Sequence, residues 1–181
     1  MEPHSPKHLS NNYLDLPSCA GQLYWLAYTL TGDETKARST FQASVDELVE
    51  GSTHVFHDWM CHWARRLVIE ATVGIVQADL QRSVKLFASS AAASLEPNGS
   101  DRRAKFFPLT PASLQNSLLK LDIFPRFAFV LRTLEAYSRK KAARLLNVDT
   151  ALSEAANVYA IRFLSGEFHN SAAAALHQQN S

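Results

Sequence analysis

The chain has 181 residues, of which 46% are hydrophobic and 19% are charged, so a packed core is available and global disorder is excluded. The formal net charge is +1, yet residues 1–97 carry seven Lys/Arg against eleven Asp/Glu (−4) and residues 98–181 carry eleven against six (+5). The more basic second half is compatible with a nucleic-acid face. The N-terminal stretch lacks a secretory signal profile and no apolar run could cross a bilayer. We therefore expect a cytoplasmic protein, not bound to a membrane, with reduced thiols at Cys19 and Cys61.

Helical periodicity recurs along the first half, and strand signals are scarce. Apolar residues at three- and four-residue steps predict a first helix over residues 23–30, which the Thr-Gly-Asp turn at residues 31–33 ends. Asp33 is the expected N-cap of a second helix through about residue 49. A third helix is expected from about residue 55 into the seventies, and residues 76–90 continue helically without a clear start.

Small residues, Pro97 and Gly99 predict a flexible linker over residues 91–109. Helical patterning restarts with Thr110 as an N-cap and Pro111 in the first helical position. An apolar stripe over residues 127–134 precedes a turn at 136–138, a short helix, a turn at 147–150 capped by Asp149 or Thr150, and a last helix through about residue 164. The predicted fold is all-α, with two small helical bundles on a flexible linker: an arm over residues 1–19, a bundle over 20–90, a second over 110–165 and a disordered tail over 166–181.

The stretch over residues 54–71 holds three histidines, a cysteine and two tryptophans. Its larger apolar side chains repeat at helical spacing and are expected to form the inner face of a bundle helix: Phe56, Trp59, Met60, Trp63, Ala64 and Leu67. His54, His57 and Cys61 also share one side, with His62 adjacent, in residue types that bind zinc. A fourth ligand is missing from this group, so we expect no metal site, and no cofactor is predicted.

A short helix, a turn near residues 147–149 and a longer helix predict a helix-turn-helix unit over residues 138–164. The second helix has the length that such units place in the major groove of DNA. Any three-helix bundle contains a similar corner, so the pattern alone does not establish DNA binding.

Three blocks of the sequence resemble the extracytoplasmic-function (ECF) sigma factors of RNA polymerase, in the sigma-70 family. Residues 121–148, "LDIFPRFAFVLRTLEAYSRKKAARLLNV", are similar to promoter-reading region four. Residues 23–42, "LYWLAYTLTGDETKARSTFQ", and residues 56–71, "FHDWMCHWARRLVIEA", are similar to region two. The resemblance implies a divergent, non-enzymatic member with two helical domains that bind core RNA polymerase and promoter DNA, and an anti-sigma protein as a further partner.

The region-two block departs from the family at its contact positions. Typical members present acidic residues to the polymerase, whereas the corresponding positions here, the candidate polymerase contacts, are Lys36, Arg38, Ser39 and Gln42. Cations in that place would repel a basic partner surface. Residues 71–80 lack the basic cluster that usually grips the promoter, so Arg65 and Arg66 are the remaining candidates for phosphate contacts there, with a solvated helix face as the alternative.

The region-four block departs from the family in its recognition helix. The candidate base-contact positions there are Thr150, Ser153, Glu154 and Asn157, and a glutamate can accept a hydrogen bond from cytosine. The positive charge stands on the preceding helix, where the candidate phosphate contacts are Arg139, Lys140, Lys141 and Arg144. A solvated basic helix face is the alternative interpretation of these four residues.

Two functional hypotheses follow. The first is a divergent sigma factor, and the second is a degenerate sigma-like binding module or decoy that acts through protein–protein contacts. The sequence offers no nucleophile–base pairing, phosphate-binding glycine loop or paired carboxylates that would indicate an enzyme.

Overall fold

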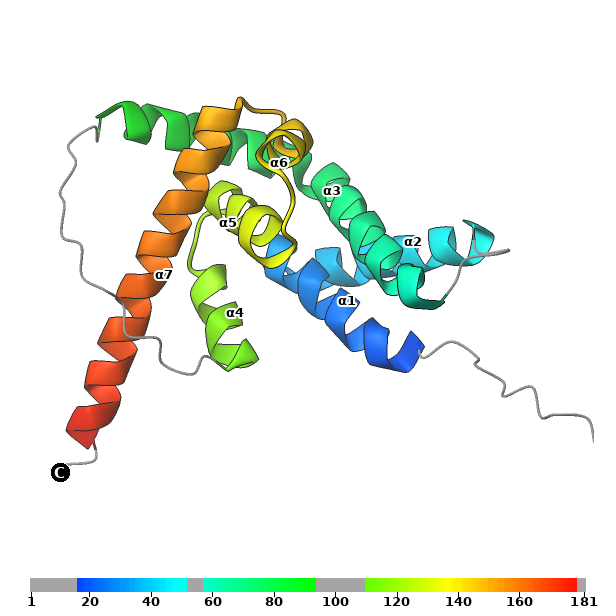
Figure 1. Cartoon of the computed structure of the whole chain (residues 1–181), viewed down its shortest axis with the longest axis horizontal. Coiled ribbons are helices and arrows are strands. Elements are labelled where there is room, and N and C mark those ends of the chain that lie inside the picture. Colours follow the sequence, from blue (N-terminus) through cyan, green and yellow to red (C-terminus); the bar gives the residue numbers. More distant parts are fainter. Residues whose placement is uncertain (1–15, 52–56, 94–109, 179–181) are drawn as a thin grey trace, which may run out of the picture.

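The computed structural model describes residues 16–51, 57–93 and 110–178 (Figure 1). The predicted all-α class is confirmed, because these residues form helices and turns and contain no strand. In chain order the elements are α1 (Leu16–Thr31), α2 (Glu34–Gly51), α3 (His57–Ala93), α4 (Pro111–Leu119), α5 (Ile123–Phe129), the π-helical turn η1 (Val130–Leu134), α6 (Arg139–Leu146) and α7 (Thr150–Gln178).

Three predicted N-caps are confirmed by hydrogen bonds. Oδ1 of Asp33 accepts from the backbone N–H of Lys36 at 2.8 Å, at the start of α2. The hydroxyl of Thr110 accepts from a backbone N–H at 3.2 Å, and Pro111 occupies the first position of α4. Asp149, one of the two predicted caps of α7, accepts from a backbone N–H at 2.7 Å. Each cap satisfies a donor that the first helical turn leaves unpaired.

Two helices are longer than the sequence indicates. The expected third helix and residues 76–90 form one helix, α3, whose 37 residues run into the first positions of the predicted linker. The last helix, α7, continues beyond residue 164 to Gln178, whereas the sequence predicts a disordered tail from residue 166. Four consecutive alanines at residues 172–175 favour this continuation, since alanine has the highest helix propensity. The remaining predicted linker, residues 94–109, lies outside the described residues, as do residues 1–15 of the predicted N-terminal arm.

The predicted inner face of α3 is confirmed where its side chains are described. Ala64 and Leu67 are buried and Trp63 is half-buried in the core. Phe56 and the side chains of Trp59 and Met60 lie outside the described part of the chain.

A single buried cluster joins the two predicted bundles. Its members come from both halves of the chain, and the largest fully buried ones include Leu26 of α1, Val68 of α3, and Phe124 and Phe127 of α5. Figure 1 shows α5 lying against α1 beneath α6, with the far part of α3 crossing behind α7. A smaller cluster, from α4, the turn after it, α5 and α7, completes the second half: Leu118, Leu121, Phe129, Ala160 and Leu164. The two bundles therefore share apolar surface whose burial stabilises their contact.

Polar groups at the contact between the halves find partners across it. The buried N–H of Phe124, at the start of α5, donates to Oγ of Ser83 in α3 at 3.2 Å. This serine takes the place of a local cap, because the preceding Asp122 makes no side-chain capping hydrogen bond. Nε2 of Gln115 in α4 donates to Oγ1 of Thr29 in α1 at 3.2 Å. These hydrogen bonds add to the attraction between the two halves. Because they are directional, they also define one register of the halves against each other.

Gly32 ends α1 in the left-handed backbone region, with φ of +68°, and lies against a buried arginine. A Cβ at this position would stand 2.8 Å from Nη1 of Arg126. The guanidinium therefore lies beside the C-terminal end of α1, where the helix dipole favours a cation. Burial lowers the pKa of Arg126, and the nearby carboxylate of Asp122 opposes that shift. Nε of Arg126 has no hydrogen-bond partner within the described structure.

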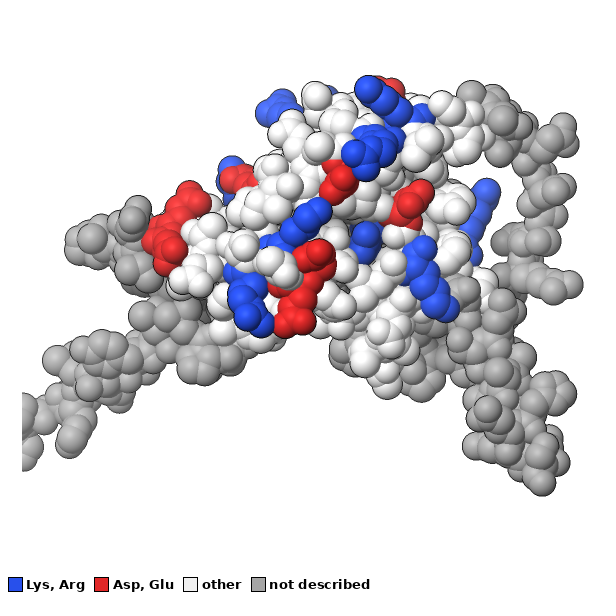
Figure 2. All heavy atoms as spheres, turned by 180° about the vertical axis from the view of Figure 1, so that it is seen from behind, with Lys and Arg blue, Asp and Glu red and all other residues white. Residues whose placement is uncertain are grey.

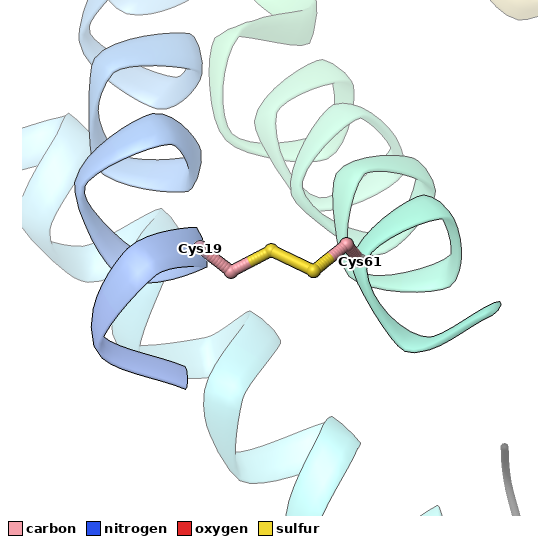
Figure 3. The surroundings of a disulfide bond; sticks show 2 residues. All are labelled: Cys19 and Cys61. Carbon is pink, nitrogen blue, oxygen red and sulfur yellow. A yellow bond between two sulfur atoms is a disulfide. The ribbon is translucent and has the colours of Figure 1, made fainter. Parts of the chain in front are cut away.

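The two cysteines form a disulfide, which corrects the expectation of reduced thiols. Cys19 of α1 and Cys61 of α3 are bonded through their sulfur atoms, with Cα atoms 6.3 Å apart (Figure 3). Forty-two positions separate them in the sequence, so only the packing of α1 beside α3 reveals their proximity. Among the described residues, no helix is both long and apolar enough to traverse a membrane.

Substitution Gly32→Ala is expected to destabilise the protein by about 1–2 kcal/mol, since alanine is strained at positive φ and the guanidinium of Arg126 must shift to make room for the methyl group. The matched control is Gly74→Ala, at an exposed position of α3 where an added Cβ meets nothing within 4 Å. We expect this control to stabilise by about 0.5–1 kcal/mol. Urea unfolding followed by circular dichroism measures both values. Equal effects of the two substitutions would contradict the role given to Gly32.

Candidate nucleic-acid interface

Helices α6 and α7 meet at a tight corner near the predicted turn. Oγ of Ser138 accepts from the backbone N–H of Lys141 at 3.3 Å and caps α6. Asn147 ends α6 in the left-handed region, with φ of 53° and ψ of 49°, as asparagine tolerates well. The side chain of Asp149 then caps α7. Ser138, Asn147 and Asp149 are polar residues with local capping roles, which is why the sequence predicts this corner correctly.

Helix α6 is strongly amphipathic. Ala142, Ala143 and Leu146 are buried and hold the helix on the core. The four predicted phosphate contacts lie together on its exposed side: Arg139, Lys140, Lys141 and Arg144. Within the part of the chain that the structure describes, Lys140 and Arg144 form no ion pair.

Two of these four cations already have partners. Nζ of Lys141 stands 3.9 Å from the centroid of the Tyr137 ring, a cation–π contact that leaves the ammonium exposed. Nε of Arg139 lies 3.5 Å from Oε2 of Glu154 in α7, and Nε of Arg132 lies at the same distance from that oxygen. Glu154 therefore neutralises part of the basic charge at this corner.

The four predicted base contacts in α7 differ in how exposed they are. Thr150 is exposed at the start of α7, and Glu154 is half-buried against the two arginines. Ser153 is 1% exposed and Asn157 is 6% exposed. Oδ1 of Asn157 accepts from Oγ1 of Thr133 at 3.1 Å, so this amide serves packing within the second half. A side chain buried in this way does not reach a base edge in this structure.

The exposed face of α7 carries apolar side chains that sequence reasoning did not single out. Val158, Tyr159 and Ile161 are 38%, 48% and 42% exposed. Tyr159 packs edge-on against Phe87 of α3, with ring centroids 5.5 Å apart. Apolar residues occur on every side of this part of α7, so a periodicity argument does not distinguish its buried face from its exposed one.

A groove of about 1270 Å³ lies between the far end of α3, the junction of α4 and α5, and α7. Leu86, which is 62% exposed, belongs to its wall. The other apolar and aromatic lining residues are Phe87, Leu121, Pro125, Ala151, Ala155, Val158, Tyr159 and Phe163. The groove is thus built by both halves of the chain and begins beside the basic corner, where Arg139, Thr150 and Glu154 also line it.

Arg65 and Arg66, the candidate promoter contacts of the first half, are both engaged within the protein. Nε of Arg65 donates to Oε2 of Glu135 at 3.0 Å, and a second, shorter hydrogen bond joins the same two side chains. The bond to Glu135 raises the pKa of Arg65, against the effect of burial. Arg66 donates to Glu70 one turn along α3 at 2.8 Å, which raises the pKa of Arg66. Of these two arginines, only Arg66 is exposed to solvent.

The candidate polymerase contacts on α2 form two groups. Nζ of Lys36 donates to Oδ2 of Asp79 in α3 at 3.0 Å, and this bond lowers the pKa of Asp79. Arg38 pairs with Glu34 one turn earlier at 2.9 Å. Ser39 and Gln42 are exposed on the same helix. Lys36 therefore ties α2 to α3 through the carboxylate of Asp79.

The histidine-rich stretch offers no metal site among the described residues. Cys61, one member of the predicted group, is bonded to Cys19 and is not available as a thiolate ligand. His62 is exposed on α3, whereas His54 and the side chain of His57 lie outside the described residues.

The surface charge is mixed in sign on the face shown in Figure 2, where lysine and arginine side chains alternate with aspartate and glutamate. The ion pairs of α2 and α3 agree with this arrangement, since several exposed cations there have a carboxylate neighbour. On this face the charges of opposite sign therefore offset one another.

No protein-family model and no curated protein sequence matches the chain. A solved structure, the sigma factor RpoE in complex with the anti-sigma factor NepR from Bartonella quintana, has a similar chain at a TM-score of 0.48 and 14% sequence identity. The match covers 83% of this chain and 92% of that chain.

The Arg65–Glu135 pair is expected to contribute about 1–3 kcal/mol to stability, because the side chain of Glu135 is only 8% exposed and the arginine compensates its charge there. A double-mutant cycle with Arg65→Met and Glu135→Gln, followed by urea unfolding, measures this coupling energy. The Arg66–Glu70 pair, exposed within one helix, is the matched control and is expected to show much weaker coupling. Similar coupling in the two cycles would contradict a special role for the pair between the halves.

Proposed function

We propose that this chain is a divergent, non-enzymatic sigma-factor-like regulator of transcription that binds core RNA polymerase and promoter DNA. The observation that carries the proposal is the tight corner between α6 and α7, which adjoins the part of the sequence that resembles region four. Its capping residues and its exposed cations coincide with that block. The turn after α1 and the cap by Asp33 likewise fall within the block that resembles region two.

In this proposal α6 supplies the phosphate contacts. Lys140, Lys141 and Arg144 are exposed on one side of the helix and are not neutralised by an ion pair in the described structure. Arg139 contributes less, because Glu154 lies against it. Thr150 is the exposed candidate for a contact from α7. Phosphate contacts of this kind position a protein on DNA and make its affinity depend on salt.

In the first half the proposed polymerase contact is the exposed side of α2. Ser39 and Gln42 are available there, while Arg38 shares its charge with Glu34. The pairing of Lys36 with Asp79 reduces the repulsion that an isolated lysine would exert on a basic partner. This contact is consequently proposed to depend on polar and shape complementarity more than on opposite charge.

Neutralising three cations of α6 tests the DNA-binding part of the proposal. The variant Lys140→Gln/Lys141→Gln/Arg144→Gln should reduce the slope of log affinity against log salt by up to about 2.7, at about 0.9 for each phosphate that the protein no longer neutralises. Fluorescence anisotropy of the full chain on duplex DNA measures this slope. The control Arg38→Gln/Arg82→Gln/Lys85→Gln removes the same charge from exposed positions of α2 and α3. An equal change in both variants would assign the effect to net charge and remove α6 from the interface.

The second candidate function is a sigma-like binding module that has lost initiation and acts through protein–protein contacts, an anti-sigma protein being one proposed partner. The groove between α3 and α7 favours it. Leu86, Val158 and Tyr159 expose apolar surface there, and exposed apolar patches of this kind mark protein interaction sites. The burial of Ser153 and Asn157 also leaves few polar side chains of α7 for reading bases.

Co-purification with core RNA polymerase, followed by run-off transcription, separates the two candidates. Binding with transcription supports the sigma-like regulator, and binding without transcription supports the module. The variant Leu86→Ser/Tyr159→Ser should weaken partner binding if the groove is the contact, whereas Ile75→Ser, at an exposed position of α3 outside the groove, should not. The absence of polymerase binding and of DNA binding would reject the first proposal.

A further inference from the structure

The Cys19–Cys61 disulfide connects two helix starts at one end of the first bundle. Cys19 is the fourth residue of α1 and Cys61 is the fifth residue of α3. Figure 3 shows the bond bridging the opening turns of these two helices, with the rest of each helix running away from it. The segment between the two cysteines contains the whole of α2. The bond therefore closes a loop that includes one helix of the three-helix bundle.

The two cysteines differ in how exposed they are to solvent. A thiolate must reach a sulfur atom of the disulfide to reduce it, so exposure decides which of the two sulfur atoms is attacked. Cys61 is half-buried, whereas Cys19 is 7% exposed, so an incoming thiolate reaches the sulfur of Cys61 more easily.

The bundle has other contacts that hold it when the bond is broken. Beyond the disulfide, α1 packs on α3 through fully buried side chains such as Leu26 and Val68, and Lys36 ties α2 to α3. Loss of the crosslink therefore affects the end of the bundle that holds Cys19 and Cys61. The opposite end of α1, where Gly32 meets Arg126, keeps its own contacts.

We propose that the Cys19–Cys61 pair is a reversible redox switch, whose oxidised state fastens the start of α1 to the start of α3 and whose reduced state releases this end of the bundle while the core remains folded. The inference does not rest on the proposed function. If that function holds, the released end adjoins α2, which carries the candidate polymerase contacts Ser39 and Gln42, and the basic corner of α6 is unaffected.

The chemistry is a thiol–disulfide exchange with a dithiol reductant. One thiolate of the reductant attacks Sγ of Cys61, the bond between the two protein sulfur atoms breaks, and Cys19 leaves as a thiolate that takes up a proton. The second thiol of the reductant then displaces Cys61 from the mixed disulfide, and Cys61 takes up a proton. Two electrons pass to the protein, and the reductant becomes a cyclic disulfide. A small-molecule disulfide reverses the reaction, with two molecules of its thiol as products.

The test uses the native full-length chain equilibrated in dithiol/disulfide buffers of graded ratio. Alkylation followed by intact-mass measurement is expected to show both thiols appearing together in one transition without denaturant. Hydrogen exchange is expected to accelerate in residues 16–24 and 57–66 on reduction and to stay unchanged in residues 139–164. Reduction should lower the equilibrium constant for folding by about 30- to 1,000-fold, as typical for loss of a crosslink of this kind.

The variant Cys19→Ser/Cys61→Ser should match the reduced protein in every buffer. Of the single variants, Cys19→Ser should leave a thiol at Cys61 that is alkylated faster than the thiol at Cys19 in Cys61→Ser. Resistance of the bond to dithiol in the folded protein would overturn the proposal in favour of a permanent crosslink. Hydrogen-exchange rates that are identical in the oxidised and reduced protein would also overturn it. So would global unfolding on reduction, or free thiols in an oxidising buffer.

Discussion

Burial of α5 against α1 and α3 is the contact on which the arrangement of the whole chain depends. Phe124 and Phe127 of α5 are fully buried in a cluster with residues of α1 and α3. Polar groups with one favoured geometry surround this apolar contact. Oγ of Ser83 in α3 accepts from the first turn of α5, and the guanidinium of Arg126 lies against Gly32. Apolar burial supplies most of the attraction, and the polar groups define a single register, because an unpaired buried group is costly.

Ion pairs within the protein determine which of the charged candidates remain available. Arg65 is held by Glu135 across the two halves, and Lys36 is held by Asp79 within the first. What remains exposed is the basic side of α6 at one place and the apolar groove at another. The buried cluster therefore holds the helices in one body, and the surfaces that remain free for a partner lie outside it.

Local features of the fold could be predicted from the sequence, and distant contacts could not. The caps at Asp33, Thr110 and Asp149 are hydrogen bonds to a residue three positions further on, so the type of the capping residue is enough to predict them. The pairing of Arg65 with Glu135 spans 70 positions and that of Cys19 with Cys61 spans 42, and no periodicity in the sequence links such residues. The basic residues of α6 are exposed as a group, and their role as phosphate contacts stays a prediction, whereas Asn157 is buried and bonded to its distant neighbour Thr133.

The length of α3 keeps two features of the molecule apart. With 37 residues at 1.5 Å each, the helix has a length of about 55 Å. One end carries Cys61 and the other carries Leu86 and Phe87 in the wall of the groove. Between these ends Val68, Val76 and Leu80 are buried in the core, which holds the middle of the helix in place. The sulfur chemistry at one end can therefore change while the apolar surface at the other end keeps its shape.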